Sequence, residues 1–435
     1  MFGRFGSVRA GALGAWVADV TRTLLPESTP VRHRRRVRGA SPSSLSDRRS
    51  PSFPGSTKVG ARENVSEIST KCRETACRGP GYPGPVTETS PASQTTWPHL
   101  LDALLGGEDL TAETSAWAME RLMGGELTDA EIAGFLIALR AKGETAEELV
   151  GLSSTMMAKA VEISIPGPTL DIVGTGGDRL GTVNISTMSS LVAVGAGARV
   201  VKHGNRGAST TAGAADVIEA LGVDLAMSPE RVAQAATEVG ITFLFAQSFH
   251  PSMRYVAPAR RQLGVRTIFN FLGPLSNPAR VDAQALGCAH RGLAPKMAQV
   301  LAARGTRGLV FRGQDGRDKI TTSAPTDVWE VREGIVEHHE IRPSDLGVAQ
   351  VEVDALRGGA GDDNAEIVRR VLRGDRGPVR DAVLINAAAG LTAADESSDG
   401  SLLDRLHANR ERAAAALDSG AAAAVLERWV EFSRA

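Results

Sequence analysis

A glycine-rich loop is the stretch of this chain whose residue types most clearly suggest chemistry. Residues 171–187 read DIVGTGGDRLGTVNIST, in which four glycines and the carboxylate of Asp178 follow the strand-like run LDIV (170–173). Glycines accept positive φ and let a ligand approach the main chain. Successive backbone N–H groups ahead of a helix N-terminus bind anions. The loop therefore favours a phosphate ligand, with a plain tight turn as the alternative.

Two well-known nucleotide-binding patterns are excluded for this loop. No Gly-Lys pair occurs anywhere in the sequence, so there is no Walker loop, and Arg179 stands where a dinucleotide fingerprint needs its third glycine.

A second polar loop, KHGNRGASTTAG (202–213), follows the next strand-like run. Lys202, His203 and Arg206 are cationic or can become so, and hydroxyl residues lead into the next helical segment. A structural histidine is the alternative for His203. The two loops together are expected to bind a ligand with several phosphate groups.

Two further segments carry charged candidates. Residues 247–280 contain His250, Arg254, Arg260, Arg261 and Arg266, of which one or two are expected to point inward. Arginine is the bidentate partner of a carboxylate, so this segment suits an acidic ligand.

Asp315 and Asp318 in the segment 313–322 are candidate magnesium ligands. Mg²⁺ takes one or two protein carboxylates together with substrate phosphates. Turns often have the same composition, so the pair alone is weak evidence.

The elements that would position these loops alternate along the chain. Short apolar runs separated by helical stretches indicate a largely parallel sheet covered by helices, with ligands beyond the carboxyl ends of the strands. We expect strands at 170–173, 198–201, 241–246, 284–289 and 308–311, helices at 186–196, 213–222, 294–304, 381–394 and 410–432, and a β-rich excursion at 320–353.

Residues 96–165 are predicted to form a separate small helical domain. Two capping patterns support this prediction. Thr128 with Glu131 and Thr145 with Glu148 each fit a capping box. Helices from about 250–270 are expected to join this domain. The fold class is therefore α/β: a small helical domain plus a larger α/β domain, 166–435, with a central, mostly parallel sheet flanked by helices.

Composition excludes several classes of protein. Of 435 residues 42% are apolar and 23% charged, and the formal net charge of −1 gives no overall preference for a polyanion. No apolar run is long enough for a membrane helix. Three cysteines form neither a zinc pattern nor a disulfide framework, which fits a reducing compartment. Residues 1–95, basic and rich in Pro and Ser, are predicted to be a disordered tail.

The motifs Gly-Thr-Gly-Gly-Asp, Asn-x-Ser-Thr, Lys-His-Gly-Asn-Arg and Arg-Thr-x-Phe-Asn-x-Leu-Gly-Pro-Leu resemble the anthranilate phosphoribosyltransferase family from about residue 97 to 432. The resemblance implies transfer of a phosphoribosyl group from phosphoribosyl pyrophosphate to anthranilate in tryptophan biosynthesis. It also implies Mg²⁺ as cofactor, a homodimer formed through the helical domain and a cytoplasmic location, with neither membrane nor nucleic acid as partner.

The resemblance also implies roles for individual residues. Arg260 would meet the anthranilate carboxylate, and Ser186 and Asp318 would be metal ligands. The implied anthranilate-binding residues are Gly174, Asn205, Arg260, His203, His250 and Pro274. The implied phosphoribosyl-pyrophosphate-binding residues are Gly174, Gly177, Asp178, Thr182, Asn184, Ile185, Ser186, Thr187, Lys202, His203, Gly204, Asn205, Arg206, Gly207, Ala208, Ser209 and Thr210.

One departure from the family pattern concerns the metal loop. The family usually reads Asp-Gly-Leu-Asp-Glu, whereas this chain reads Asp315-Gly-Arg-Asp-Lys319, so Lys319 stands where the family has a glutamate ligand. Either the ammonium takes the place of a metal ion, or the chain is a divergent paralogue with weakened or altered activity.

Two further alternatives come from other classes. One is a non-catalytic relative that binds nucleic acid through its basic tail, which contains RHRRRVR (32–38). The other is a nucleoside phosphorylase, which would need a nucleobase site in place of Arg260.

Overall fold

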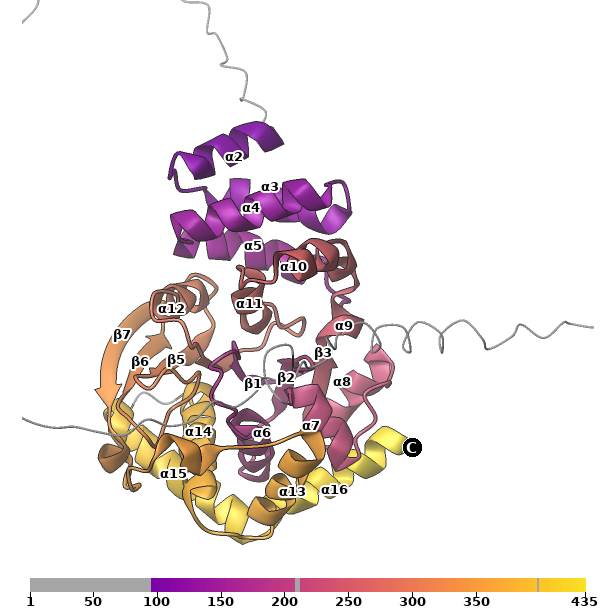
Figure 1. Ribbon diagram of the computed structural model, residues 1–435. Coiled ribbons are helices and arrows are strands. Elements are labelled where there is room, and N and C mark those ends of the chain that lie inside the picture. Colours follow the sequence, from indigo (N-terminus) through magenta and orange to yellow (C-terminus); the bar gives the residue numbers. More distant parts are fainter. Residues whose placement is uncertain (1–94, 208–211, 397–398) are drawn as a thin grey trace, which may run out of the picture. The chain divides into compact units, whose positions relative to one another are not determined.

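The computed structural model describes residues 95–207, 212–396 and 399–435, which form a seven-stranded sheet with helices (Figure 1). The strand order is β3-β2-β1-β4-β5-β6-β7. Strands β1 to β5 are parallel, and β6 and β7 are antiparallel. The predicted fold class is confirmed. The strands are β1 (Leu170–Gly174), β2 (Val200–Gly204), β3 (Ile241–Phe245), β4 (Ala283–Gly287), β5 (Arg307–Gly313), β6 (Thr326–Arg332) and β7 (Ile335–Ile341).

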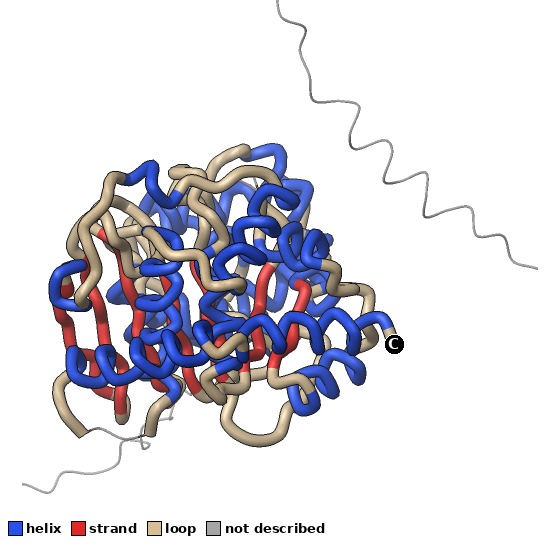
Figure 2. The backbone as a smooth tube through the Cα atoms, turned by 90° about the horizontal axis from the view of Figure 1, so that it is seen from below, coloured by secondary structure: helices blue, strands red, loops and turns tan. Residues whose placement is uncertain are grey.

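The two faces of the sheet pack into different cores, as the alternation of side chains along a strand requires. Leu170 and Ile172 of β1 belong to one core, which they share with α6 and α14. Val173 belongs to the other, which also takes in α12 and the N-terminal helices. Because both faces are covered there, β1 to β4 are mostly apolar, whereas β6 and β7 at the edge of the sheet carry several charged residues. Figure 2 shows the strands side by side with helices along them.

Two of the N-terminal helices begin where their capping residues predict. The side chains of Thr128 and Glu131 close a capping box at α4, and Thr145 and Glu148 close one at α5. The helix α10 contacts α4, and η1 contacts α3. This part of the chain comprises α2 (Trp97–Leu105), α3 (Ala112–Gly124), α4 (Asp129–Lys142) and α5 (Ala146–Ala158), with α9 (Ala246–Phe249), η1 (Pro251–Tyr255), α10 (Ala257–Leu263), α11 (Phe269–Leu272) and η2 (Gly273–Leu275) later in the sequence.

The remaining helices accompany the sheet. None of the helices in the described ranges is long and apolar enough to cross a membrane. They are α6 (Ile185–Gly195), α7 (Ala214–Leu221), α8 (Pro229–Glu238), α12 (Ala294–Ala303), η3 (Pro343–Leu346), η4 (Val353–Leu356), α13 (Gly361–Leu372), α14 (Pro378–Ala394), α15 (Leu402–Asp418) and α16 (Ala421–Arg434).

The structure corrects one predicted helix. The segment 410–432 is not continuous, because α15 ends at Asp418 and α16 begins at Ala421. Gly420 between them has φ +79°, a left-handed conformation that ends a helix. The predicted tail, 1–95, lies outside the described residues apart from Thr95.

Candidate active site

The candidate site lies where the chain reverses its direction of travel across the sheet. From β1 the chain runs outward through β2 and β3, then returns to place β4 on the other side of β1. Such a switch point leaves a crevice beyond the carboxyl ends of the two central strands. Gly174 ends β1 directly opposite Gly287, which ends β4. The loop after β5 reaches this point and brings Asp318 with it.

The structure gives the glycines a role that differs from the predicted one. A Cβ at Gly174 would lie 2.9 Å from Asp318 Cγ and would overlap the carboxylate oxygen, and a Cβ at Gly287 would overlap the Asp318 main chain. At Gly177, with φ +74°, a Cβ would overlap the Arg266 guanidinium. These three glycines therefore make room for protein side chains. Gly176 and Gly181, with positive φ and open space, are the glycines that leave the main chain accessible.

An ammonium group bridges two carboxylates across this crevice. Lys319 Nζ lies 2.5 Å from Asp318 Oδ1 and 3.1 Å from Asp178 Oδ2. The other Asp318 oxygen accepts a hydrogen bond from the Gly176 N–H at 2.6 Å. Burial would lower the pKa of Lys319, but Asp318 and Asp178 outweigh it and raise the pKa, so the group is charged.

The N-terminus of α6 contributes the Ser186 N–H and two hydroxyls at the same edge. Ile185, Ser186 and Thr187 form its first turn, after Asn184 at the N-cap position. Lys202 Nζ on β2 donates to Ser186 Oγ at 3.1 Å, so the two loops meet. The Thr187 hydroxyl is buried and has no hydrogen-bond partner among the described residues. A helix N-terminus with a neighbouring ammonium is an anion-binding arrangement.

Lys202 is held inside the sheet rather than at the surface. Its ammonium also donates to the Ile172 carbonyl at 2.5 Å. Burial lowers the pKa of Lys202 to about 8, although Asp171 and Asp318 oppose the shift. Burial raises the pKa of Asp171 to about 6, against the effects of Lys202 and a hydrogen bond from Asn277. The Asn277 side-chain N–H donates to Asp171 Oδ2 at 2.9 Å.

A buried arginine joins the loop between β1 and α6 to the loop after β5. The Arg317 side chain is fully buried; its Nε donates to Thr182 Oγ1 at 3.1 Å and its Nη1 to Asp315 Oδ2 at 2.6 Å. Asp315 also accepts from the Thr321 hydroxyl. As arranged, the Asp315 carboxylate is committed to Arg317 and Thr321 and does not fit the predicted role of a magnesium ligand.

The second polar loop is described only in part. The Arg206 guanidinium donates to Glu219 at 2.8 Å and also pairs with Asp216. The Gly207 N–H donates to Asp216, and the Asn205 side chain accepts from the Arg206 N–H. Gly204 ends β2. As placed, Arg206 is neutralised by two acids, so its binding of a phosphate stays a prediction. Ala208, Ser209 and Thr210 lie outside the described residues.

Two neutral histidines lie together near the 273–276 turn. The rings of His203 and His250 have centroids 5.1 Å apart. One nitrogen of each is bonded to a carbonyl, that of Gly273 for His203 and that of Ser276 for His250. Burial lowers the pKa of His203 to about 3 and that of His250 to about 4. Pro274 is buried in this turn, so the structure brings these three predicted residues together.

The basic segment points two of its arginines inward. The Arg260 guanidinium lies over the Phe269 ring, 5.3 Å from its centroid, and burial lowers its pKa. No carboxylate of the described chain pairs with it. Arg266 Nη2 is buried against Gly177 and has no hydrogen-bond partner among the described residues. Arg254 and Arg261 are exposed. With the buried His250, three of the five basic residues point inward, one more than predicted.

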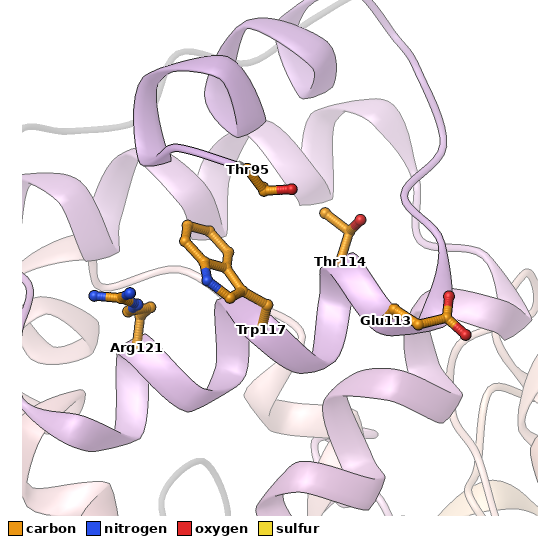
Figure 3. A pocket seen from close by; sticks show the side chains of 5 residues that line it. All are labelled: Thr95, Glu113, Thr114, Trp117 and Arg121. Atoms are coloured by element: carbon orange, nitrogen blue, oxygen red, sulfur yellow. The ribbon is translucent and has the colours of Figure 1, made fainter. Parts of the chain in front are cut away.

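A separate pocket of about 350 Å³ lies on the N-terminal helices (Figure 3). The residues that line it are Thr95, Glu113, Thr114, Trp117 and Arg121. None of them belongs to the sequence-predicted site.

Comparison with known proteins bears on what this crevice does. Residues 166–423 match the α/β domain of a glycosyl transferase family, and residues 98–160 match the helical bundle domain of such a family. An anthranilate phosphoribosyltransferase from Arthrobacter sp. is 57% identical over 343 residues, 79% of this chain and 97% of its own. One from Nocardioides sp. is 58% identical over 336 residues, 77% of this chain and 98% of its own.

The chain belongs to the anthranilate phosphoribosyltransferase family.

Solved structures of the anthranilate phosphoribosyltransferase family share the fold. The Thermus thermophilus enzyme matches with a TM-score of 0.72 at 43% identity, over 77% of this chain and 99% of its own. The Saccharomyces cerevisiae enzyme in complex with PRPP and Mg matches with a TM-score of 0.71 at 27% identity, over 79% of this chain and 99% of its own.

The oxygen atoms of Asp318 and Ser186 show whether this site fits the Mg²⁺ expected for an anthranilate phosphoribosyltransferase. Both Asp318 oxygens are occupied, one by Lys319 and one by the Gly176 N–H, and Ser186 Oγ accepts from Lys202. Among the described residues, the group of acids and histidines close enough to hold an ion is Glu330, Glu337 and His339, where Glu330 is already paired with Arg405. The protein side chains as arranged do not fit a metal ion at Ser186 and Asp318.

Sequence reasoning missed three residues that shape this site. The charge of Asp171 opposes the lowering of the Lys202 pKa, Asn277 donates a hydrogen bond to Asp171, and Arg317 anchors the loop after β5. One of the three carries a signal in the sequence: Asp171 is a charged residue in an otherwise apolar strand run.

Proposed function

We propose that the protein transfers the phosphoribosyl group of phosphoribosyl pyrophosphate to the amine of anthranilate, giving N-(5-phosphoribosyl)anthranilate and pyrophosphate. The observation that carries the proposal is the convergence of Lys202, Lys319 and the α6 N-terminus at the switch point of the sheet. The names of the relatives support the same reaction, and one yeast structure is described as a complex with 4-fluoroanthranilate.

The groups at the site would act by charge stabilisation and positioning. Departure of pyrophosphate leaves positive charge on the ribose and negative charge on the leaving group, and preorganised donors lower the barrier to that separation. Lys202, Lys319 and the Ser186 N–H at the start of α6 are suited to hold the leaving group. An aromatic amine needs little deprotonation before attack, so neutral His203 and His250 suit the path of the acceptor without serving as a strong base.

Arg260 is the residue proposed to bind the anthranilate carboxylate. Its guanidinium is desolvated and has no acidic partner in the described part of the chain. Desolvation without a partner is costly, and a bidentate carboxylate ligand would offset it. Asn205 and Pro274 are proposed to complete the acceptor site.

The test is the loss of anthranilate fluorescence after mixing with phosphoribosyl pyrophosphate, measured over a magnesium series from zero to millimolar. Turnover supports the proposal. Phosphorolysis of thymidine without anthranilate turnover would favour the nucleoside phosphorylase instead. Absence of turnover from folded protein at every magnesium concentration would favour a divergent paralogue, and calorimetric titration with single-stranded DNA would then test the nucleic-acid-binding alternative.

Further parts of the proposal concern metal, assembly and location. We infer that Mg²⁺ accompanies the substrate as a counter-ion of its phosphates. We also propose a homodimer through the helical domain, 96–165, where Leu105 is 76% exposed, with 166–435 as the donor-binding domain. Light scattering measures the assembly. A cytoplasmic location agrees with a chain of few cysteines.

A further inference from the structure

The ammonium of Lys319 occupies the place where a cation would join the protein to a polyphosphate. It lies between the carboxylates of Asp178 and Asp318, whose side chains are only 5% and 7% exposed. Two buried carboxylates this close to a glycine loop would repel an anionic ligand unless a cation separated them from it. Lys319 supplies that cation from the chain itself.

The geometry leaves one donor of this ammonium for a ligand. A lysine ammonium has three N–H donors, and Asp178 and Asp318 accept two of them. Within the described ranges no third acceptor lies within hydrogen-bond distance of Lys319, and its side chain is 14% exposed. An ammonium that bonds two carboxylates and one phosphate oxygen makes the same bridge as a metal ion.

A divalent cation and Lys319 would compete for the same oxygen. Magnesium binds carboxylate oxygens at about 2.1 Å, which would place it against an ammonium that already lies 2.5 Å from Asp318 Oδ1. The main chain restrains Asp318 from turning away, because the Gly176 N–H holds its second oxygen and the carboxylate packs closely against Gly174. The ion pair therefore disfavours a metal at Asp318.

We propose that Lys319 is a built-in cation of the pyrophosphate site, so that this chain binds phosphoribosyl pyrophosphate with one divalent ion fewer than a site that carries a carboxylate at position 319. The inference rests on the proposed function, since it concerns the same ligand. It predicts substrate binding that persists when divalent ions are removed.

Two binding measurements on the full chain test this inference without relying on turnover. Calorimetric titration of phosphoribosyl pyrophosphate in excess chelator reports binding without metal. Paramagnetic resonance of free Mn²⁺, in the presence of saturating phosphoribosyl pyrophosphate, counts the ions bound at each site. The expected results are measurable binding in chelator, and one Mn²⁺ fewer for the unchanged chain than for the Lys319→Glu variant.

Two substitutions at position 319 separate the charge of this residue from its size. Lys319→Gln should weaken binding in chelator by about tenfold or more, the loss of one charged hydrogen bond to the ligand. Lys319→Glu should abolish binding in chelator and restore it when Mn²⁺ is added. The control is Lys159→Glu, which makes the same charge change at a lysine paired with Glu120 on the surface, and should leave both measurements unchanged.

The outcomes distinguish this inference from the proposed function. Binding with equal Mn²⁺ counts in the unchanged chain and Lys319→Glu would overturn the inference alone, as would a Lys319→Gln variant that keeps its affinity in chelator. Failure of the folded, unchanged chain to bind phosphoribosyl pyrophosphate at any metal concentration would overturn both. If Lys319→Glu does not fold, the chelator titrations of the unchanged chain and Lys319→Gln still decide the question.

Discussion

The buried Arg317 offers the sharpest test of how the loop after β5 is held. Its guanidinium bonds to Asp315, to the Thr182 and Ser323 hydroxyls and to the Val353 carbonyl, and its side chain is completely buried. The substitution Arg317→Leu keeps an apolar stem but removes every one of these bonds. It leaves the Asp315 carboxylate, 7% exposed, without its cation.

The expected loss of free energy of unfolding follows from that unpaired charge. Breaking a buried ion pair by removing one partner destabilises a protein by about 3–5 kcal/mol. At about 2–4 °C per kcal/mol, the midpoint of thermal unfolding should fall by about 6–20 °C. Removing both charges, as in Arg317→Leu with Asp315→Leu, should cost less than Arg317→Leu alone, because no charge is then left unpaired.

The assay is thermal unfolding, monitored by circular dichroism, of Arg317→Leu, of Asp315→Leu and of the double variant. The matched control is Arg357→Leu, which breaks an exposed pair with Asp354 in which the side chains are 64% and 73% exposed. Exposed pairs contribute about 0–1 kcal/mol. If Arg317→Leu shifts the midpoint no more than Arg357→Leu, or if the double variant is no more stable than Arg317→Leu, the assigned role of the buried pair is wrong.

Three further results are expected. Gly174→Ala should raise KM for phosphoribosyl pyrophosphate by about tenfold or more, since the added methyl group must displace Asp318; unchanged steady-state kinetics would contradict the close packing. Arg260→Gln should raise KM for anthranilate by a factor of about ten to a hundred while KM for the donor stays constant. The pKa values of His203 and His250 are lowered to about 3 and about 4 against about 6.5 when unfolded, so their stabilising contribution is present above pH 6.5 and is lost as the pH falls toward 4. Thermal midpoints against pH should show this fall, and His203→Asn should flatten it.

Local patterns were enough to predict most elements of the fold. Capping boxes at Thr128 and Thr145 act within four residues, so their side-chain and main-chain partners are readable from spacing. Apolar runs separated by helical stretches likewise predicted the parallel strands β1 to β5. The helix expected over 410–432 is interrupted at a local signal, Gly420, whose left-handed conformation separates α15 from α16.

Candidate residues at strand ends were also predictable, because parallel strands deliver their following loops to one edge of the sheet. That reasoning placed Lys202, Ser186 and Asp178 in one region, and the structure joins Lys202 to Ser186 directly. It could not assign partners. Arg206 and Asp315 were expected to face a ligand, yet their nearest charges belong to residues that only folding brings close.

By itself the sequence determined the order of elements, the class of fold and the motifs that indicate a phosphate ligand, because each depends on neighbours along the chain. Only the tertiary structure decided that Gly174 and Gly177 make room for Asp318 and Arg266, and that Lys319 bridges two carboxylates. Asp178 and Lys319 are far apart along the chain, and the crossover from β3 back to β4 is what brings their loops to one crevice. Contacts of this kind depend on the strand order of the sheet, which spacing along a single chain does not specify.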